Sequence, residues 1–234
     1  MTRADLGTYL LIVGLLLSAA PLTVATRFAA LLRLNAARWV IPLYVGTLAV
    51  VIAYDLFLLG LGPPWPADGA TSIPIGLAAG IVGIPVAWMI DRSILRAGRT
   101  FTERFARRTR GAQRRDRGRA RRPNNPLLVA TGGGLEELIY RFYLPGMAAA
   151  VLGVGLGVGL SLVLYALIHG VFGWWQVLAK GILGVFFLVL LAATGTPLAP
   201  CVAHAGFNLL ATTTVRLRPR AGTRLRIEAK VDPR

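Results

Sequence analysis

The segment from Gly134 to Arg141 places two carboxylates and a guanidinium inside a long apolar stretch. Arg141 follows Glu137 by four residues, so a helix would bring these two side chains together as a pair. Glu136 would point about 100° away from Glu137 and would lack that partner. Ionisable groups at membrane depth are costly and usually mark a functional site. We therefore predict that Glu136 accepts a proton from an attacking water.

The only two histidines of the chain lie in two later apolar segments. His169 follows Tyr165 by four residues and His204 precedes Asn208 by four, so each pair would share one helix face. His169 could share or orient the water beside Glu136. His204 and Asn208 could donate hydrogen bonds to a developing oxyanion. The three patches together indicate hydrolysis, provided that the rest of the chain holds them in contact.

The elements that must position these residues are transmembrane helices. The chain has 234 residues, of which 55% are hydrophobic and 15% charged, and its uncharged runs reach the length of about 20 residues that a membrane span needs. The single cysteine, Cys201, excludes an intramolecular disulfide and a cysteine-based metal cluster. We predict an all-α, polytopic transmembrane helical bundle of about seven spans: 6–25, 39–61, 73–90, 126–144, 147–169, 177–193 and 197–215.

The net charge of +16 is concentrated in two segments that adjoin predicted spans. Arginines crowd between Arg92 and Arg122, and bases again outnumber acids between Arg216 and Arg234. Such segments are typical of cytoplasmic connections under the positive-inside rule. That reading places the N-terminus outside and the C-terminus in the cytoplasm. It also favours attraction of anionic lipids to the arginine-rich loop over nucleic-acid binding, so no nucleic-acid partner is expected.

The apolar runs and the charge divide the chain into four parts. We expect Pro145 and Gly146 to end the fourth span. We expect Asp55 to lie at a membrane interface, and the side chain of Lys180 to extend to a membrane interface. Closely spaced glycines in the fifth span should let a neighbouring helix approach. The parts are 1–91, three N-terminal spans; 92–125, an arginine-rich cytoplasmic loop; 126–215, a four-span catalytic core; and 216–234, a basic cytoplasmic tail.

The depths of the predicted site residues are compatible. Glu136 would lie about 15 Å into its span from the cytoplasmic side, and His204 about 10 Å into its span from the outside, at 1.5 Å per helical residue. His169 would fall near the cytoplasmic end of the fifth span. We therefore expect the site in the cytoplasmic half of the membrane, where water and substrate arrive from the cytosol.

Three motifs in this order, each in its own span, resemble a known family. They are Glu-Glu-x-x-x-Arg, aromatic-x-x-x-His and His-x-x-x-Asn. This pattern is similar to the CPBP intramembrane proteases, the CAAX prenyl endopeptidase and bacteriocin-processing group, whose shared domain is also called ABI. The resemblance covers about Pro126 to Val215. The chain departs from the family pattern at Tyr165, where phenylalanine is usual, and at Phe142, where glycine often follows the arginine.

The resemblance implies an intramembrane endopeptidase and a role for each motif residue. Glu136 and His169 would activate the attacking water, and the other four residues would support it: Glu137 and Arg141 beside the site, and His204 and Asn208 as the oxyanion hole.

The same residues leave two alternatives open for metal dependence, a zinc-bound water and a metal-free one. Glu136, His169 and His204 form a two-histidine, one-carboxylate set that could hold zinc with an open water position. The chain has no His-Glu-x-x-His helix, and the spacing serves a metal-free, glutamate-activated water equally well. The resemblance to family members with that mechanism favours no tightly bound metal.

The substrate class follows from the family resemblance. It implies a membrane-associated or prenylated, CAAX-type, protein or peptide as substrate. The composition is typical of a bacterial protein, and we expect the chain to be a multi-pass protein of the plasma membrane. Two alternatives remain: a non-catalytic scaffold or bacteriocin-immunity factor that retains the fold, and a small transporter that uses the buried charges. Oligomeric state leaves no signal in the sequence.

Overall fold

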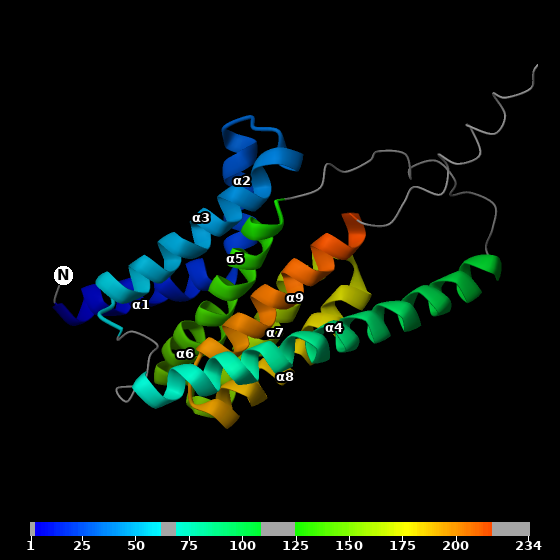
Figure 1. Ribbon diagram of the computed structural model, residues 1–234. Helices are drawn as coiled ribbons and strands as arrows, with labels where there is room; N and C mark the ends of the chain where they lie inside the picture. The colour runs from blue at the N-terminus through cyan, green and yellow to red at the C-terminus, as the bar shows by residue number, and fades with distance from the viewer. Residues whose placement is uncertain (1–2, 62–68, 109–124, 217–234) are drawn as a thin grey trace, which may run out of the picture.

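The computed structural model describes residues 3–61, 69–108 and 125–216, and every element in these ranges is helical (Figure 1). Part of the predicted arginine-rich loop, residues 109–124, and the predicted basic tail beyond residue 216 lie outside them. The elements are α1 (Arg3–Ala19), α2 (Pro21–Leu31), α3 (Ala36–Phe57), α4 (Gly69–Arg108), α5 (Pro126–Leu138), the π-helical turn η1 (Ile139–Tyr143), α6 (Leu144–Leu152), α7 (Val154–Leu167), the 3-10 turn η2 (Ile168–Phe172), α8 (Trp174–Thr194) and α9 (Leu198–Arg216).

Four helices in the described ranges are long and apolar enough to cross a membrane, over residues 38–57, 73–101, 154–172 and 174–194. The bent pair of α1 and α2 would make a fifth. Helices α5, α6 and α9 are not among these candidates, although α5 and α9 carry residues of the predicted site. The predicted all-α membrane bundle is confirmed, whereas the count of seven spans stays a prediction.

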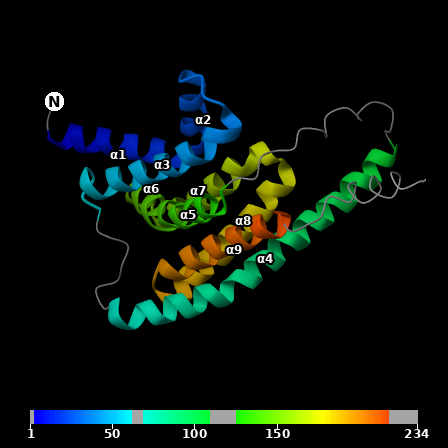
Figure 2. The ribbon, with the colours of Figure 1, turned by 45° about the horizontal axis from the view of Figure 1, so that its top comes forward.

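Helix α9 is surrounded by three other helices. It packs against α4, α5 and α8, while α3 packs against α2 and α5. Figures 1 and 2 show α4 and α9 side by side along most of the length of α9. A Cβ on Gly80 of α4 would lie 2.8 Å from the carbonyl oxygen of Ala199, so the absence of a side chain there permits the close contact. The motif-bearing helices α5 and α9 are therefore held against each other by the bundle.

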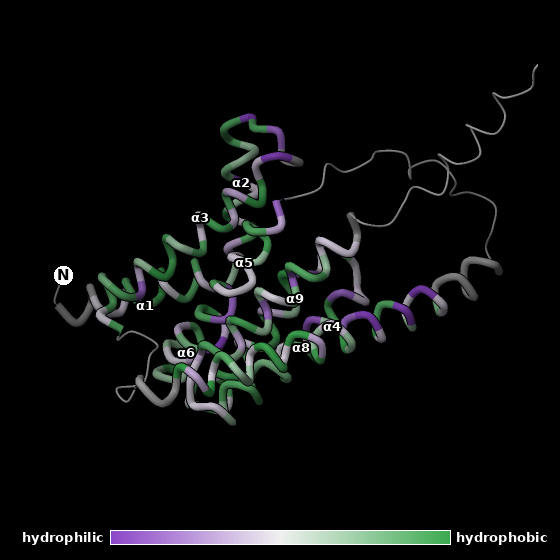
Figure 3. Tube along the Cα trace, in the orientation of Figure 1, coloured by the Kyte–Doolittle hydropathy of each residue, from purple (hydrophilic) through white to green (hydrophobic). Residues whose placement is uncertain are grey.

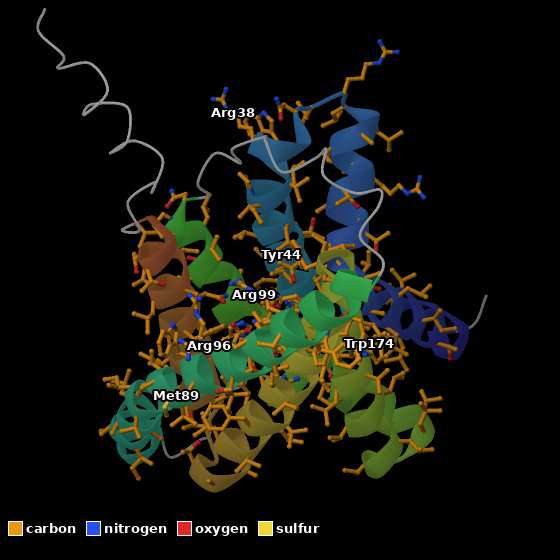
Figure 4. The ribbon with its side chains drawn as sticks, turned by 90° about the vertical axis from the view of Figure 1, so that its right-hand side faces the viewer. Arg38, Tyr44, Met89, Arg96, Arg99 and Trp174 are labelled. Carbon is orange, nitrogen blue, oxygen red and sulfur yellow. The ribbon has the colours of Figure 1, made fainter. Side chains whose placement is uncertain are left out.

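Helix α4 continues through the first part of the predicted arginine-rich segment, from Arg92 to Arg108. Arginine and alanine are good helix formers, and no proline occurs between Pro85 and Pro123. Figures 1 and 3 show this hydrophilic end of α4 projecting beyond the apolar bundle. Arg96 and Arg99, labelled in Figure 4, are exposed along it.

The predicted boundary between the fourth and fifth spans is also wrong. The helix does not stop at Pro145, because α6 follows the π-helical turn directly and continues through this residue to Leu152. The chain turns at Gly153 instead, with φ of 83°. Helix α7 then packs back on α6, and a Cβ on Gly157 would lie 2.6 Å from the backbone nitrogen of Ala149. The predicted close approach at these glycines is confirmed at Gly157.

The first predicted span, 6–25, is not one straight helix. It breaks at Ala20, and α1 and α2 meet at an angle of 82°. Pro21 opens α2, and a residue before proline is disfavoured in the helical region.

Two charged residues expected near membrane interfaces are buried within the helical bundle. Asp55 is 0% exposed, and Lys180 pairs with Asp91 of α4 at a distance of 3.4 Å. Lys180 does not need to snorkel, because α4 brings a carboxylate to its ammonium group inside the bundle.

Candidate active site

The acidic motif lies where an α-helix changes to a π-helical turn. Asn125 caps the start of α5, its side chain accepting a hydrogen bond from the N–H of Leu127 at 3.0 Å. After Leu138 the turn widens, and the N–H of Leu144 bonds the carbonyl of Ile139. A π-turn changes which side chains share a helix face, and such turns are frequent at functional sites. Both glutamates lie just before the turn, and Arg141 lies within it.

Glu137 is fully buried and contacts both Arg141 and His204. Its Oε2 lies 3.3 Å from Nε of Arg141, which confirms the predicted pair, and its Oε1 lies 2.7 Å from Nδ1 of His204 on α9. The carboxylate can only accept, so Nδ1 of His204 carries the hydrogen and donates it to Glu137. Glu137 therefore orients the imidazole and leaves Nε2 on its other side.

Arg141 is held from several directions. Its guanidinium lies over the ring of Tyr165 at 4.5 Å, and Nη1 donates to the carbonyl of Tyr140 at 3.1 Å. The hydroxyl of Ser161 donates to the same carbonyl. A Cβ on Gly184 of α8 would lie 3.1 Å from Nη2 of Arg141. The buried guanidinium is thus fixed by a carboxylate, a carbonyl and an aromatic face, the kind of pairing that a buried charge requires.

Glu136 faces α3 and α9 rather than Arg141. The hydroxyl of Tyr44 on α3 donates a hydrogen bond of 2.8 Å to Oε1. The other oxygen, Oε2, is buried, has no hydrogen-bond partner among the described residues and lies 3.9 Å from Nε2 of His204. A distance of 3.9 Å is too long for a direct hydrogen bond. A water or a substrate atom would be needed to connect the two groups.

His169 lies in the turn η2 and contacts the same aromatic ring as His204. Its Nδ1 donates to the carbonyl of Tyr165 at 3.0 Å, so Nε2 of a neutral ring keeps its lone pair. The centroid of the Tyr165 ring is 5.4 Å from that of His169 and 6.1 Å from that of His204. Tyr165 thus links the two histidines. The ring of His204 is further held by stacking on Phe187 at 5.0 Å.

Asn208 lies one turn after His204 on α9, where α9 touches α5. Its Nδ2 donates to the carbonyl of Val129 at 3.2 Å, which uses one of its two amide hydrogens. A Cβ on Gly133 would lie 2.5 Å from this nitrogen and 3.0 Å from Cδ2 of His204. The side-chain-free surface at Gly133 therefore lets α9 reach the acidic motif.

The structure brings four of the six predicted residues into one network: Glu136, Glu137, Arg141 and His204. Asn208 borders it at Gly133, and His169 reaches it through Tyr165.

Tyr44 was missed, since it lies in an apolar span far from every motif. The Asp91–Lys180 pair could have been predicted from the sequence, because two opposite charges in or beside predicted spans tend to pair with each other. Lys180 also lies near this network, with its ammonium 4.5 Å from the ring centroid of Phe207 on α9.

No three histidine, cysteine, aspartate or glutamate side chains in the described ranges are arranged to hold a metal ion. In the predicted zinc set, Oε2 of Glu136 and Nε2 of His204 lie 3.9 Å apart, and each histidine engages its Nδ1, which leaves Nε2 for any further contact. Glu136, His169 and His204, as they are arranged here, do not form such a group. The metal-free mechanism stays a prediction.

Comparison with known proteins finds a family match for part of the chain. Residues 124–210 match a family model described as type II CAAX prenyl endopeptidase Rce1-like. No curated protein and no solved structure gives a significant match. The matched segment includes all six predicted site residues, and it confirms the resemblance to the CPBP proteases over α5 to α9. Tyr44 and Asp91 lie outside it.

Proposed function

We propose that this multi-pass membrane protein is an intramembrane endopeptidase in which Glu136 activates the attacking water. The observation that carries the proposal is the orientation of Glu136, with Oε1 anchored by Tyr44 and Oε2 buried, unpartnered and 3.9 Å from Nε2 of His204. That arrangement suits a water or a carbonyl oxygen between the two side chains. The family match supports a peptidase over other hydrolases.

In the proposed reaction, Glu136 transfers one proton from the attacking water to the leaving amine. Glu136 takes a proton from the water as the oxygen attacks the scissile carbonyl carbon, and the lone pair on Nε2 of His169 orients the same water. The tetrahedral intermediate then breaks its C–N bond, and Glu136 returns the proton to the leaving amine. The products are a new carboxyl terminus and a new amino terminus, and the enzyme is regenerated.

His204 and Asn208 serve the developing oxyanion. An imidazolium at His204 donates from both nitrogens, from Nδ1 to Glu137 and from Nε2 to the oxyanion, and the Glu137 carboxylate stabilises its charge. With His204 protonated, two carboxylates and two cations balance in the buried network formed with Arg141. The second amide hydrogen of Asn208 is the other proposed donor.

The substrate is a membrane-associated or prenylated, CAAX-type, protein or peptide that enters from the cytoplasmic side of the plasma membrane. Support comes from the family match and from the basic end of α4, whose exposed Arg96 and Arg99 fit an anionic cytoplasmic surface (Figure 4).

The test compares newly formed protein termini in host membranes that contain the unmodified chain, Glu136→Gln or Asp55→Asn. Asp55 is the control, because it is also a buried carboxylate but lies outside the site network, and neither of its oxygens has a hydrogen-bond partner among the described residues. We expect new termini with the unmodified chain and with Asp55→Asn, and none with Glu136→Gln. If Glu136→Gln gave the same termini and rescued a deletion phenotype equally, the peptidase proposal would fail and a scaffold would replace it.

A further inference from the structure

The contact between Tyr44 and Glu136 joins residues 92 positions apart. Tyr44 belongs to α3, outside the segment that matches the peptidase family, and its side chain is buried. Figure 4 labels Tyr44 where α3 meets the rest of the bundle. Among the described residues, no other side chain donates a hydrogen bond to Glu136 at this length. The family segment therefore does not by itself supply the group that holds the catalytic carboxylate.

Packing fixes the position of the Tyr44 hydroxyl. Tyr44, Leu48 and Val51 follow one face of α3 and are buried in a cluster with Ile139 and Tyr140. A rotation or slip of α3 would expose this apolar face to other contacts and withdraw the hydroxyl at the same time. Because the tyrosine ring is rigid and its surroundings are packed, the hydroxyl is held in one place with little entropy left to lose.

The hydrogen bond also selects the oxygen that performs the chemistry. A carboxylate can rotate about its last torsion, but a donor 2.8 Å from Oε1 holds it in one orientation. Oε2 is then the oxygen that faces Nε2 of His204. Without the hydroxyl, Oε1 would be a buried oxygen with no partner, and the carboxylate would be free to turn towards another donor.

We infer that Tyr44 is a positioning residue of the active site and that the catalytic unit includes α3. The inference rests on the proposed function of Glu136. Tyr44 does not touch the substrate; it holds Glu136 in the orientation in which Oε2 meets the water.

The first experiment measures peptide hydrolysis by the full-length protein in lipid nanodiscs, with a substrate identified from the new termini. Tyr44→Phe removes the hydroxyl and keeps the ring. Tyr54→Phe is the matched control, because Tyr54 lies on the same helix and its hydroxyl bonds the carbonyl of Leu10 at 2.7 Å, away from the site. We expect Tyr44→Phe to lower kcat about 10-fold to 100-fold with KM unchanged, and Tyr54→Phe to leave both within about twofold of the unmodified protein.

A second comparison separates positioning from a general structural effect. In a Glu136→Asp background the shortened carboxylate no longer reaches the same place, so Tyr44→Phe should lower kcat by less than about threefold there. Equal losses in both backgrounds, or equal kcat values for Tyr44→Phe and Tyr54→Phe, would overturn the inference.

The third readout does not require activity. The thermal midpoints of Tyr44→Phe and Glu136→Gln should be non-additive, whereas those of Tyr54→Phe and Glu136→Gln should add. If the midpoints of Tyr44→Phe and Glu136→Gln are non-additive but no hydrolysis depends on Glu136, the proposed function is rejected and the Tyr44–Glu136 contact is retained. Additive midpoints for Tyr44→Phe and Glu136→Gln would reject the contact itself.

Discussion

Replacing Gly133 by alanine should disable the site while its two neighbours tolerate the same change. Gly132, Gly133 and Gly134 are consecutive on α5, but only Gly133 faces the site residues of α9. The new Cβ would lie 2.5 Å from Nδ2 of Asn208 and 3.0 and 3.2 Å from two ring atoms of His204. At Gly132 the nearest atom is 3.5 Å away, and at Gly134 it is 3.9 Å away.

The size of the effect follows from these distances. Ordinary Cβ contacts begin at 3.4 Å, so Asn208 must move by about 0.9 Å and the His204 ring by about 0.4 Å. The amide can rotate, but the imidazole is held by Glu137 at 2.7 Å and by its stacking on Phe187. A misplacement near 1 Å can cost about 100-fold in rate, so we expect Gly133→Ala to lower kcat/KM about 10-fold to 100-fold. Overpacking should also cost about 1–3 kcal/mol of stability.

The assay is the nanodisc hydrolysis reaction, with thermal unfolding measured on the same samples. Gly132→Ala and Gly134→Ala should keep kcat/KM within about threefold of the unmodified protein and gain up to about 1 kcal/mol, because alanine is the better helix former. If Gly133→Ala retained the activity of Gly134→Ala, then α9 would not depend on that surface and the proposed geometry of His204 would be wrong.

Three further substitutions probe the groups around the site. Asp91→Asn leaves the ammonium of Lys180 buried without its carboxylate, so thermal or denaturant unfolding should show a loss of about 3–5 kcal/mol in the free energy of unfolding. The double variant Asp91→Leu, Lys180→Met should recover most of that stability. An unchanged midpoint for the single variant would show that the pair is not buried. Arg141→Lys keeps the charge but loses the planar group that spans Glu137 and the Tyr165 ring, and hydrolysis should fall at least about 10-fold; full activity would mean that charge alone suffices. Asn208→Ala should lower kcat about 100-fold with little change in KM if its amide serves the oxyanion, whereas a lower unfolding midpoint at normal kcat would assign it only to holding α9 on α5.

Local patterns in the sequence were sufficient to predict several parts of the site. The Glu137–Arg141 pair was predicted because residues four apart on an α-helix are neighbours on its surface, and the structure places Oε2 of Glu137 3.3 Å from Nε of Arg141. The all-α membrane class was predicted because apolar runs near the length of a span have few other uses. The four-residue spacing of Tyr165 and His169 likewise predicted their contact.

The ends of helices were harder to predict, because they depend on the packing of neighbouring segments. Pro145 is a reasonable stop signal, yet the chain continues to Leu152 and turns at Gly153, where α7 can pack on α6. Arg92 opens a charged segment, yet α4 continues through it. Propensity is a weak local preference that tertiary contacts override.

Only the tertiary structure decided which partner each site residue has. The sequence by itself determined that two carboxylates, an arginine and two histidines occur in apolar helices, because composition and helical periodicity are local properties. It did not indicate that Tyr44 would hold Oε1 of Glu136, or that Glu137 would take Nδ1 of His204. Those contacts join residues 92 and 67 positions apart, and they exist because α3 and α9 both pack against α5. Such pairings depend on helix rotation and close approach, which no local pattern encodes.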